Sequence, residues 1–378
     1  MDNFIPDNDA VYETLDKLYD EDKFTDIINE ITKIPKEKWS NKLWFRLIGA
    51  YNSSERFGEA SRELQEIFPR CRSNEDIARY WYQRGYSFYK TDHEFAAKHF
   101  YERGLAADPD DTLNLKGEIE ECNSFLLEDL HKLAGISNRV KITLEKHCAS
   151  GMGRVKYRVS DEEFSMRLGY LSAIRRIPGT KFVLGFKDFL KTFSDDDKPV
   201  VREFLKKNFK ITDKKSLDDF CNNNFSYNLS LLLHNVCSNV IGKPDFDTSK
   251  LDINGRELFS DLTVFFSYIA KYLPERGGLS AWDICEKIGF ARNSFACGII
   301  TEADYRAIVN KMTDFAKNSF SSFAEYLVSL VIGSGTFMFL EDNRSVKSAI
   351  KFINEMMPLV LGGDVPDIMW NETVGSNR

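Results

Sequence analysis

The amino-acid sequence predicts an all-α protein in which a short stack of helical hairpins precedes a helical domain, with one small β-hairpin at their junction. Through most of the 378 residues, apolar side chains recur every three or four positions, as on the buried face of a helix. Helix-start signals also recur, in which a serine or threonine is followed three residues later by an acidic residue, as in a capping box. We interpret four such pairs as capping boxes: Ser160 with Glu163, Ser280 with Asp283, Thr301 with Asp304, and Ser322 with Glu325.

The composition is that of a globular protein and argues against two classes of partner. Hydrophobic residues make up 43% of the chain and charged residues 29%, which is ordinary for a soluble domain. Residues 1–30 hold ten carboxylates against two lysines, a balance of −8, so the rest of the chain is close to +1 and no nucleic-acid partner is expected. The longest weakly charged run, residues 326–340, is shorter than the ~20 apolar residues of a membrane helix. The N-terminal residues do not resemble a signal peptide. We therefore expect a cytoplasmic protein with no membrane partner.

Cysteine and histidine spacing predicts neither a metal site nor a cofactor. The seven cysteines include no Cys-x-x-Cys pair, and the five histidines include no His-x-x-x-His pair. Scattered cysteines in odd number suit buried thiols in a reducing compartment. Gly151-Met152-Gly153 and Gly333-Ser334-Gly335 do not complete a phosphate-binding motif. We interpret them as a hairpin turn and a helix interruption.

An internal repeat organises the first part of the chain. Each copy has a tryptophan, an alanine sixteen residues later and a large residue four beyond that. The two sets are Trp44, Ala60 and Leu64, then Trp81, Ala97 and Tyr101. A degenerate earlier copy begins at Tyr12. The pattern resembles the tetratricopeptide repeat, which implies a stack of paired helices over residues 1–135, completed by a capping helix near 111–127.

Three tyrosines on the first helix of the second copy are the candidate binding residues. Tyr82, Tyr86 and Tyr89 are spaced by four and three positions, so they share one helix face. By the tetratricopeptide resemblance, that face lines a concave groove. The groove would also include Phe45, Asn52 and Lys90. Tyrosines offer rigid amphipathic contact area, so we expect a protein or peptide partner. The alternative is that the C-terminal domain covers these tyrosines.

Residues 136–160 form the expected junction. Val140, Ile142 and Leu144 alternate with polar residues, and so do residues 154–159 after a turn-rich stretch. This alternation predicts a β-hairpin, and the basic residues on its other face are typical of an edge strand.

Residues 161–378 are expected to form the helical C-terminal domain. Helices are predicted over 182–193, 198–207, 215–241 with a break near 222–224, 255–273, 322–332 and 345–357. Residues 280–310 form its most distinctive segment, because two helix-start signals flank a strongly apolar helix face.

The same segment carries a family resemblance. Ala281-Trp282-Asp283-Ile284-Cys285, Ala291-Arg292 and the residues from Ala296 to Glu302 resemble the signature of a bacterial domain of unknown function, the family numbered 1266. The resemblance continues to Met369-Trp370; Glu286 and Asn293-Ser294 depart from it. It implies a mostly helical fold and brings no established activity.

The signature residues are interpreted as structural. They are Trp282, Asp283, Arg292, Gly298, Thr301 and Trp370. Asp283 is assigned as the acid of its own helix's capping box. It lies nine residues from Arg292, on the opposite face of the helix, so these two side chains cannot act as a pair.

The sequence therefore favours a protein-interaction module, either a bacterial adaptor or a toxin-neutralising partner. The alternative is an enzyme whose site is assembled from scattered polar residues in the C-terminal domain. Such an enzyme would need a deep pocket with convergent polar groups near Arg292 and Trp370.

Overall fold

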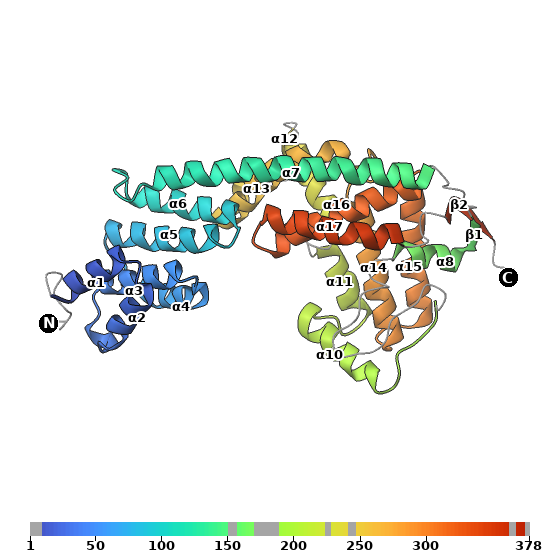
Figure 1. The fold of residues 1–378 in the computed structure, drawn as a ribbon. Helices are drawn as coiled ribbons and strands as arrows, with labels where there is room; N and C mark the ends of the chain where they lie inside the picture. The colour runs from blue at the N-terminus through green and yellow to red at the C-terminus, as the bar shows by residue number, and fades with distance from the viewer. Residues whose placement is uncertain are drawn as a thin grey trace. The chain divides into compact units, whose positions relative to one another are not determined.

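The computed structural model describes residues 10–149, 157–169, 189–223, 228–240, 247–362 and 368–374, and these are mostly helical (Figure 1). The predicted all-α class is confirmed. The chain divides into two compact units: unit 1 is residues 1–129 with 343–346, and unit 2 is residues 130–342 with 347–378. The division falls within a helix, and the domain bounds expected from the sequence remain predictions.

Residues 10–129 of unit 1 form three consecutive helix pairs and the beginning of a long helix. The helices are α1 (Ala10–Asp20) and α2 (Phe24–Thr32), α3 (Asn41–Ser53) and α4 (Phe57–Ile67), α5 (Asn74–Tyr89) and α6 (Glu94–Ala107), then α7 (Leu115–Ala149). Short 3-10 turns at Lys36–Lys38 and Phe68–Arg70 precede the second and third pairs. Each helix contacts its partner, and each pair contacts the next.

The turn inside each pair has the same geometry. Asp22, Glu55 and Asp92 adopt left-handed backbone conformations, with φ of 53°, 57° and 65°. The next residue's N–H donates to a carbonyl five positions back, as in a Schellman motif. These bonds run from Lys23 to Leu18 (2.8 Å), Arg56 to Tyr51 (2.8 Å) and His93 to Phe88 (3.0 Å). The three helix pairs are thus repeats of one local structure.

The shared turn fixes which residues of the copies are equivalent. Counting back from Leu18 and Tyr51, the counterpart of Trp44 in the first copy is Val11 and not Tyr12. The first copy therefore begins one residue earlier than the sequence pattern suggests. In its second helix, Ile27 is the counterpart of Ala60.

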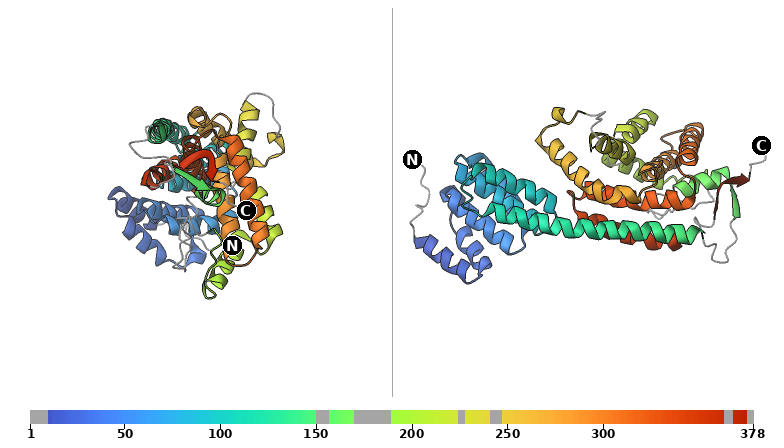
Figure 2. Two further views of the ribbon diagram at one scale, coloured as in Figure 1. Left: turned by 90° about the vertical axis from the view of Figure 1, so that its right-hand side faces the viewer. Right: turned by 90° about the horizontal axis from the view of Figure 1, so that it is seen from above.

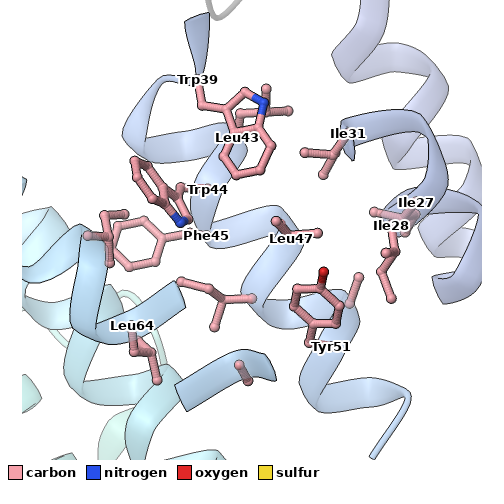
Figure 3. Close-up of a cluster of buried hydrophobic side chains, with 14 of the residues drawn as sticks. Ile27, Ile28, Ile31, Trp39, Leu43, Trp44, Phe45, Leu47, Tyr51 and Leu64 are labelled. Atoms are coloured by element: carbon pink, nitrogen blue, oxygen red, sulfur yellow. The ribbon is translucent and has the colours of Figure 1, made fainter. Parts of the chain in front are cut away.

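The core of unit 1 lies between the paired helices. Figure 3 shows Ile27 and Ile31 of α2 facing Leu43 and Leu47 of α3. The repeat alanines Ala60 and Ala97 are fully buried, as expected for small residues between close helices. At Gly85 of α5 an added Cβ would lie 2.5 Å from the Tyr101 ring of α6, so these two helices approach closely. Leu115 and Cys122 of α7 bury against the third pair, in the capping position that the sequence predicts.

The predicted β-hairpin is wrong in its first strand. Residues 139–149 belong to α7, which Figure 2 shows as one continuous helix. The valine and leucine of the apparent alternation also fit a helical stripe, because Leu133, Ile136, Val140 and Leu144 are buried at spacings of three, four and four. The intervening turn lies outside the described residues. β1 (Tyr157–Ser160) pairs in parallel with β2 (Ile368–Val374), and a parallel pair cannot be a hairpin.

Unit 2 is built around one central helix. Besides the rest of α7 and most of α17 it contains α8 (Asp161–Leu168), α10 (Asp197–Phe209), α11 (Lys214–Asn223), α12 (Leu229–Val240), α13 (Ile253–Ile269), α14 (Ser280–Ala296), α15 (Glu302–Ser319) and α16 (Phe323–Glu341). α17 spans Val346–Gly362, and 3-10 turns occur at Thr248–Lys250 and Ala270–Tyr272. α14 contacts α8, α10, α11, α12, α15 and α16. Most of the helix predicted over 182–193 lies outside the described residues.

Three of the four helix-start signals begin a helix. Ser160, Thr301 and Ser322 accept hydrogen bonds from the amides of Glu163 (3.1 Å), Asp304 (3.2 Å) and Glu325 (3.3 Å). Only Thr301 and Asp304 complete the reciprocal capping box among these three. The fourth pair, Ser280 with Asp283, does not form a capping box, and Leu279 is the N-cap of that helix.

The glycines of α16 do not interrupt that helix, contrary to the prediction. An added Cβ at Gly333 would lie 2.7 Å from the Cβ of Trp282, and one at Gly335 would lie 2.6 Å from Ile353. The glycines therefore let α16 approach α14 and α17 closely. By length and composition α16 could cross a membrane, since an 18-residue stretch of it has a mean hydropathy of 1.6. Of that stretch, 78% is buried inside the structure.

Candidate functional site

A groove of about 560 Å³ opens on unit 1. Its lining includes Tyr19, Phe45, Arg46, Gly49, Arg79 and Tyr82. These residues come from α1, α3 and α5, the first helix of each pair. Because the three pairs repeat one geometry, their first helices present corresponding faces to the same concave surface.

The groove combines aromatic rings with paired charges. The Arg46 guanidinium lies 5.7 Å from the Tyr19 ring centroid and forms an ion pair with Asp16. Arg79 forms an ion pair with Glu75 at 3.0 Å. Burial is the main cause that raises the pKa of Tyr82 to about 12, so its hydroxyl stays protonated at neutral pH. The groove thus offers apolar surface, guanidinium donors and a tyrosine hydroxyl.

Two of the predicted binding residues line this groove, and three others lie toward α7. Phe45 and Tyr82 are part of the lining. Tyr86, Tyr89 and Lys90 lie at the C-terminal end of α5, where the Lys90 ammonium is 5.3 Å and 5.5 Å from the two ring centroids. The Tyr89 hydroxyl donates to Glu121 of α7 at 2.6 Å. Tyr89 therefore packs on the capping helix, with its ring centroid 6.0 Å from that of Phe125, and Tyr86 and Lys90 lie beside it, outside the groove lining.

Asn52 is placed inside unit 1. Its amide nitrogen donates to the backbone carbonyl (3.1 Å) and side-chain oxygen (2.9 Å) of Gln83, and its amide oxygen accepts from Ser87 at 2.7 Å. It is 2% exposed. Asn52 therefore joins α3 to α5 and presents no group to a partner.

Sequence reasoning missed the basic residues of the groove. Lys42 and Arg79 each lie two positions before a repeat tryptophan, Trp44 or Trp81. Both line the groove. A basic residue at equivalent positions of two copies is a signal that the sequence does contain.

In unit 2, Asp283 caps a different helix from the one predicted. Its Oδ1 accepts from the amide of Leu229 at 2.6 Å, and its Oδ2 accepts from the amide of Ser230 at 2.9 Å and from the Ser230 hydroxyl. Asp283 therefore holds the N-terminus of α12, where free amides and the helix dipole favour a carboxylate. Burial raises the pKa of Asp283, and these hydrogen bonds partly oppose the rise. Leu279 is the N-cap of α14 and makes no side-chain cap; the first-turn amide of Ala281 instead donates to the Ser329 hydroxyl of α16 at 3.1 Å.

Two further signature residues lie at the C-terminal end of α14 and at the start of α15. Gly298 follows α14 with φ of 77°, a conformation that glycine adopts easily. The Arg202 side chain donates to the carbonyl of Cys297 at 2.7 Å, which satisfies a terminal acceptor of α14. Thr301 and Asp304 form the capping box of α15.

The remaining signature residues pack in unit 2. Trp282 is fully buried, with its ring 4.8 Å from that of Phe337. The Trp370 indole donates to the Phe320 carbonyl at 3.0 Å and its ring lies 4.8 Å from that of Phe323. Arg292 is buried on α14. Neither Arg292 nor Trp370 lines the groove, or the cavity of about 500 Å³ that α11, α14 and α15 line in unit 2.

Among the residues that the structure describes, no three His, Cys, Asp or Glu side chains gather so that they could hold a metal ion. Of the seven cysteines, five are buried, and all are free thiols.

Comparison with known proteins finds one similarity. No curated protein and no solved structure matches the chain significantly. Residues 182–360 match a family model described as "Protein of unknown function (DUF1266)". The match does not include residues 1–181, so the tetratricopeptide resemblance rests on the repeat residues themselves. It includes α14 with Trp282, Asp283 and Arg292. The C-terminal part of this chain thus carries the sequence pattern of a family without a known function.

Proposed function

We propose that unit 1 is a tetratricopeptide-like module that binds a peptide segment of a partner protein, and that the chain acts as a bacterial cytoplasmic adaptor or toxin-neutralising partner. The observation that carries this proposal is the groove lined by the first helices of three consecutive pairs. A groove of this size accepts a few side chains of an extended or helical segment.

The lining favours a peptide that carries an apolar anchor beside an acidic side chain. The apolar anchor would pack on Tyr19, Phe45 and Tyr82, since rigid aromatic rings dominate many peptide interfaces. The acidic side chain would take guanidinium hydrogen bonds from Arg46 or Arg79. Both arginines now form ion pairs at partly exposed positions, and such pairs contribute little to folding. They are therefore available for exchange with a partner's carboxylate.

The experiment is selection of displayed random peptides on the immobilised full chain, followed by titration of the enriched peptides. We expect the Arg46→Ala, Arg79→Ala double variant to bind them roughly tenfold more weakly, or worse, because a charged hydrogen bond is lost at each position. Arg62→Ala, on the exposed surface of α4, is the matched control and should bind as the wild type does. Enriched peptides that bind the double variant and the wild type equally would reject the groove as the site, and so would failure of any peptide to be enriched.

A further inference from the structure

A second cavity, of about 500 Å³, lies within unit 2. Its walls are one face each of α11, α14 and α15, and Ser230 at the start of α12 contributes to its lining. We call it the lysine pocket, after Lys287 of α14 and Lys311 of α15. Its volume is in the range of small-molecule sites, about 300–1,000 Å³. It shares no residue with the groove of unit 1.

One side of the lysine pocket is apolar. Ile308, Met312 and Phe315 line it at spacings of four and three along α15, so they form one stripe. The buried side chain of Ile284 faces the same space from α14. Phe315 is 46% exposed although it borders a concave surface. Its ring, with Ile308 and Met312, gives the cavity an apolar wall that an apolar part of a ligand could cover.

The polar side carries two ammonium groups. Lys287 and Lys311 form no ion pair with any residue that the structure describes. Asp283 and Asp218 are the two acids of the lining, and Lys287 interacts electrostatically with Asp283. Both Asp283 oxygens accept hydrogen bonds from the start of α12, so that carboxylate is held by α12 and forms no direct ion pair with either lysine. The two ammonium groups can therefore pair directly with an anionic group of a ligand.

The lining groups do not favour covalent chemistry. Burial raises the pKa of the Cys221 thiol to about 12, so it stays protonated and is a weak nucleophile. The Ser230 hydroxyl donates to Asp283, and that carboxylate holds α12. The lysine pocket is therefore suited to binding and not to catalysis.

We propose that the lysine pocket binds a small amphipathic anion. Its carboxylate or phosphate pairs with Lys287 and Lys311, and its apolar part packs on Ile284, Met312 and Phe315. This site is independent of the peptide groove, and it assigns a ligand class to a pocket in the region that matches the uncharacterised family.

The test is fluorescence titration of the full chain at neutral pH with anilinonaphthalene sulfonate, an amphipathic anion that brightens in apolar surroundings. Bound probe is then displaced with octanoate, octyl phosphate or octylammonium, which share an alkyl chain and differ in the head group. We expect the two anions to compete and the cation not to, and the stronger anion identifies the preferred head group.

Variants locate the binding. The Lys287→Gln, Lys311→Gln double variant is expected to bind probe and anions roughly tenfold more weakly, since two charged contacts are lost. Lys207→Gln on the exposed surface of α10 is the matched control and should change nothing. If thermal melting shows that the double variant is unfolded, Lys311→Gln and Phe315→Ala, both at exposed positions, give the same readout.

Three results would overturn the proposal. They are wild-type affinity in the lysine variants, equal competition by octylammonium, and no binding of the probe to the wild-type chain.

Discussion

Helices α5 and α14 are nearly the same length and show how differently the two units are built. Only Ala78, Tyr80, Gly85 and Ser87 of the sixteen residues of α5 are buried. In α14 fourteen of the seventeen residues are buried, including Asp283, Glu286 and Arg292. A helix of a stack covers its neighbours with one face and leaves another for a partner. A central helix leaves little surface uncovered, and a polar side chain such as Asp283 joins it to another helix.

The two designs also differ in how far apart along the chain the contacting residues lie. In unit 1 each helix packs on the next one or two, and every pair closes with the same turn. In unit 2 the contact between Asp283 and Leu229 joins residues 54 positions apart. We therefore expect truncation of a buried residue of α14 to lower the unfolding free energy more than an equivalent truncation in unit 1 does.

The largest expected effect is that of Trp282→Ala. Trp282 is fully buried against Phe337 and Gly333, and truncation of a buried tryptophan costs about 3–5 kcal/mol of unfolding free energy. Trp81→Ala should cost clearly less, because Trp81 is only half-buried and stacks on Phe100 at the surface of the repeat. Denaturant unfolding followed by circular dichroism measures both. Equal losses would contradict the contrast between a central helix and a stacked one.

Asp283→Ala is expected to cost about 3 kcal/mol, since buried amides at the start of α12 lose a charged acceptor. Ser280→Ala is the informative partner variant. The Ser280 hydroxyl is buried without a hydrogen-bond partner among the described residues, so its removal should be nearly neutral. If instead Ser280→Ala were as harmful as loss of a cap, about 1 kcal/mol, the sequence-based capping box would be right and the assignment to α12 wrong.

Two glycine substitutions are expected to change the unfolding free energy by smaller amounts and in opposite directions. Gly85→Ala should destabilise by about 1–3 kcal/mol, because the new methyl group would overlap the Tyr101 ring. Gly135→Ala, in the exposed face of α7, meets no atom within 4 Å and should stabilise by about 0.5–1 kcal/mol. Thermal melts of the two variants should therefore shift in opposite directions. A Gly85→Ala variant as stable as the wild type would show that α5 and α6 are not in close contact.

The smallest expected effect is on the stability of the fold at acidic pH. Hydrogen bonds and ion pairing with Lys214 lower the pKa of Asp304 to about 2, below its usual value near 3.8. A lowered folded-state pKa means that its stabilising contribution is present above about pH 4 and is lost as the pH falls toward 2. Asp304→Asn should remove this part of the acid dependence. The check is the urea midpoint of both proteins between those pH values; parallel curves would show that the capping box carries no such linkage.

The sequence predicts the parts of this structure that depend on local patterns. The helix pairs follow from apolar spacing and from Trp44, Ala60 and their counterparts, and Thr301 correctly begins α15. The error at residues 139–149 has the same origin, because Val140 and Leu144 fit both an alternating strand and a helical stripe. Local pattern alone could not separate these two periods.

Long-range partners could not be read from the sequence. Asp283 carries a valid local capping pattern, and only the fold brings the start of α12 to its carboxylate. Asn52 lies on a helix face that a repeat could expose, yet Gln83 and Ser87 of the next repeat occupy its amide. Lys42 and Arg79 were predictable in part, since they occupy equivalent repeat positions, but their role depends on the concave arrangement of three helices.

The central claim, that the groove is where unit 1 binds a partner peptide, is tested most directly by filling it. Gly49 lines the groove, and a Cβ added there would have no neighbour closer than 3.5 Å, so we expect the ring of Gly49→Trp to enter the groove. Gly58 lies on α4 with nothing within 4 Å, and Gly58→Trp is the matched control. The measurement is the affinity of a selected peptide for both variants, with thermal melts to confirm folding. We expect binding to be abolished in Gly49→Trp and unchanged in Gly58→Trp, whereas wild-type affinity in a folded Gly49→Trp variant would contradict the account.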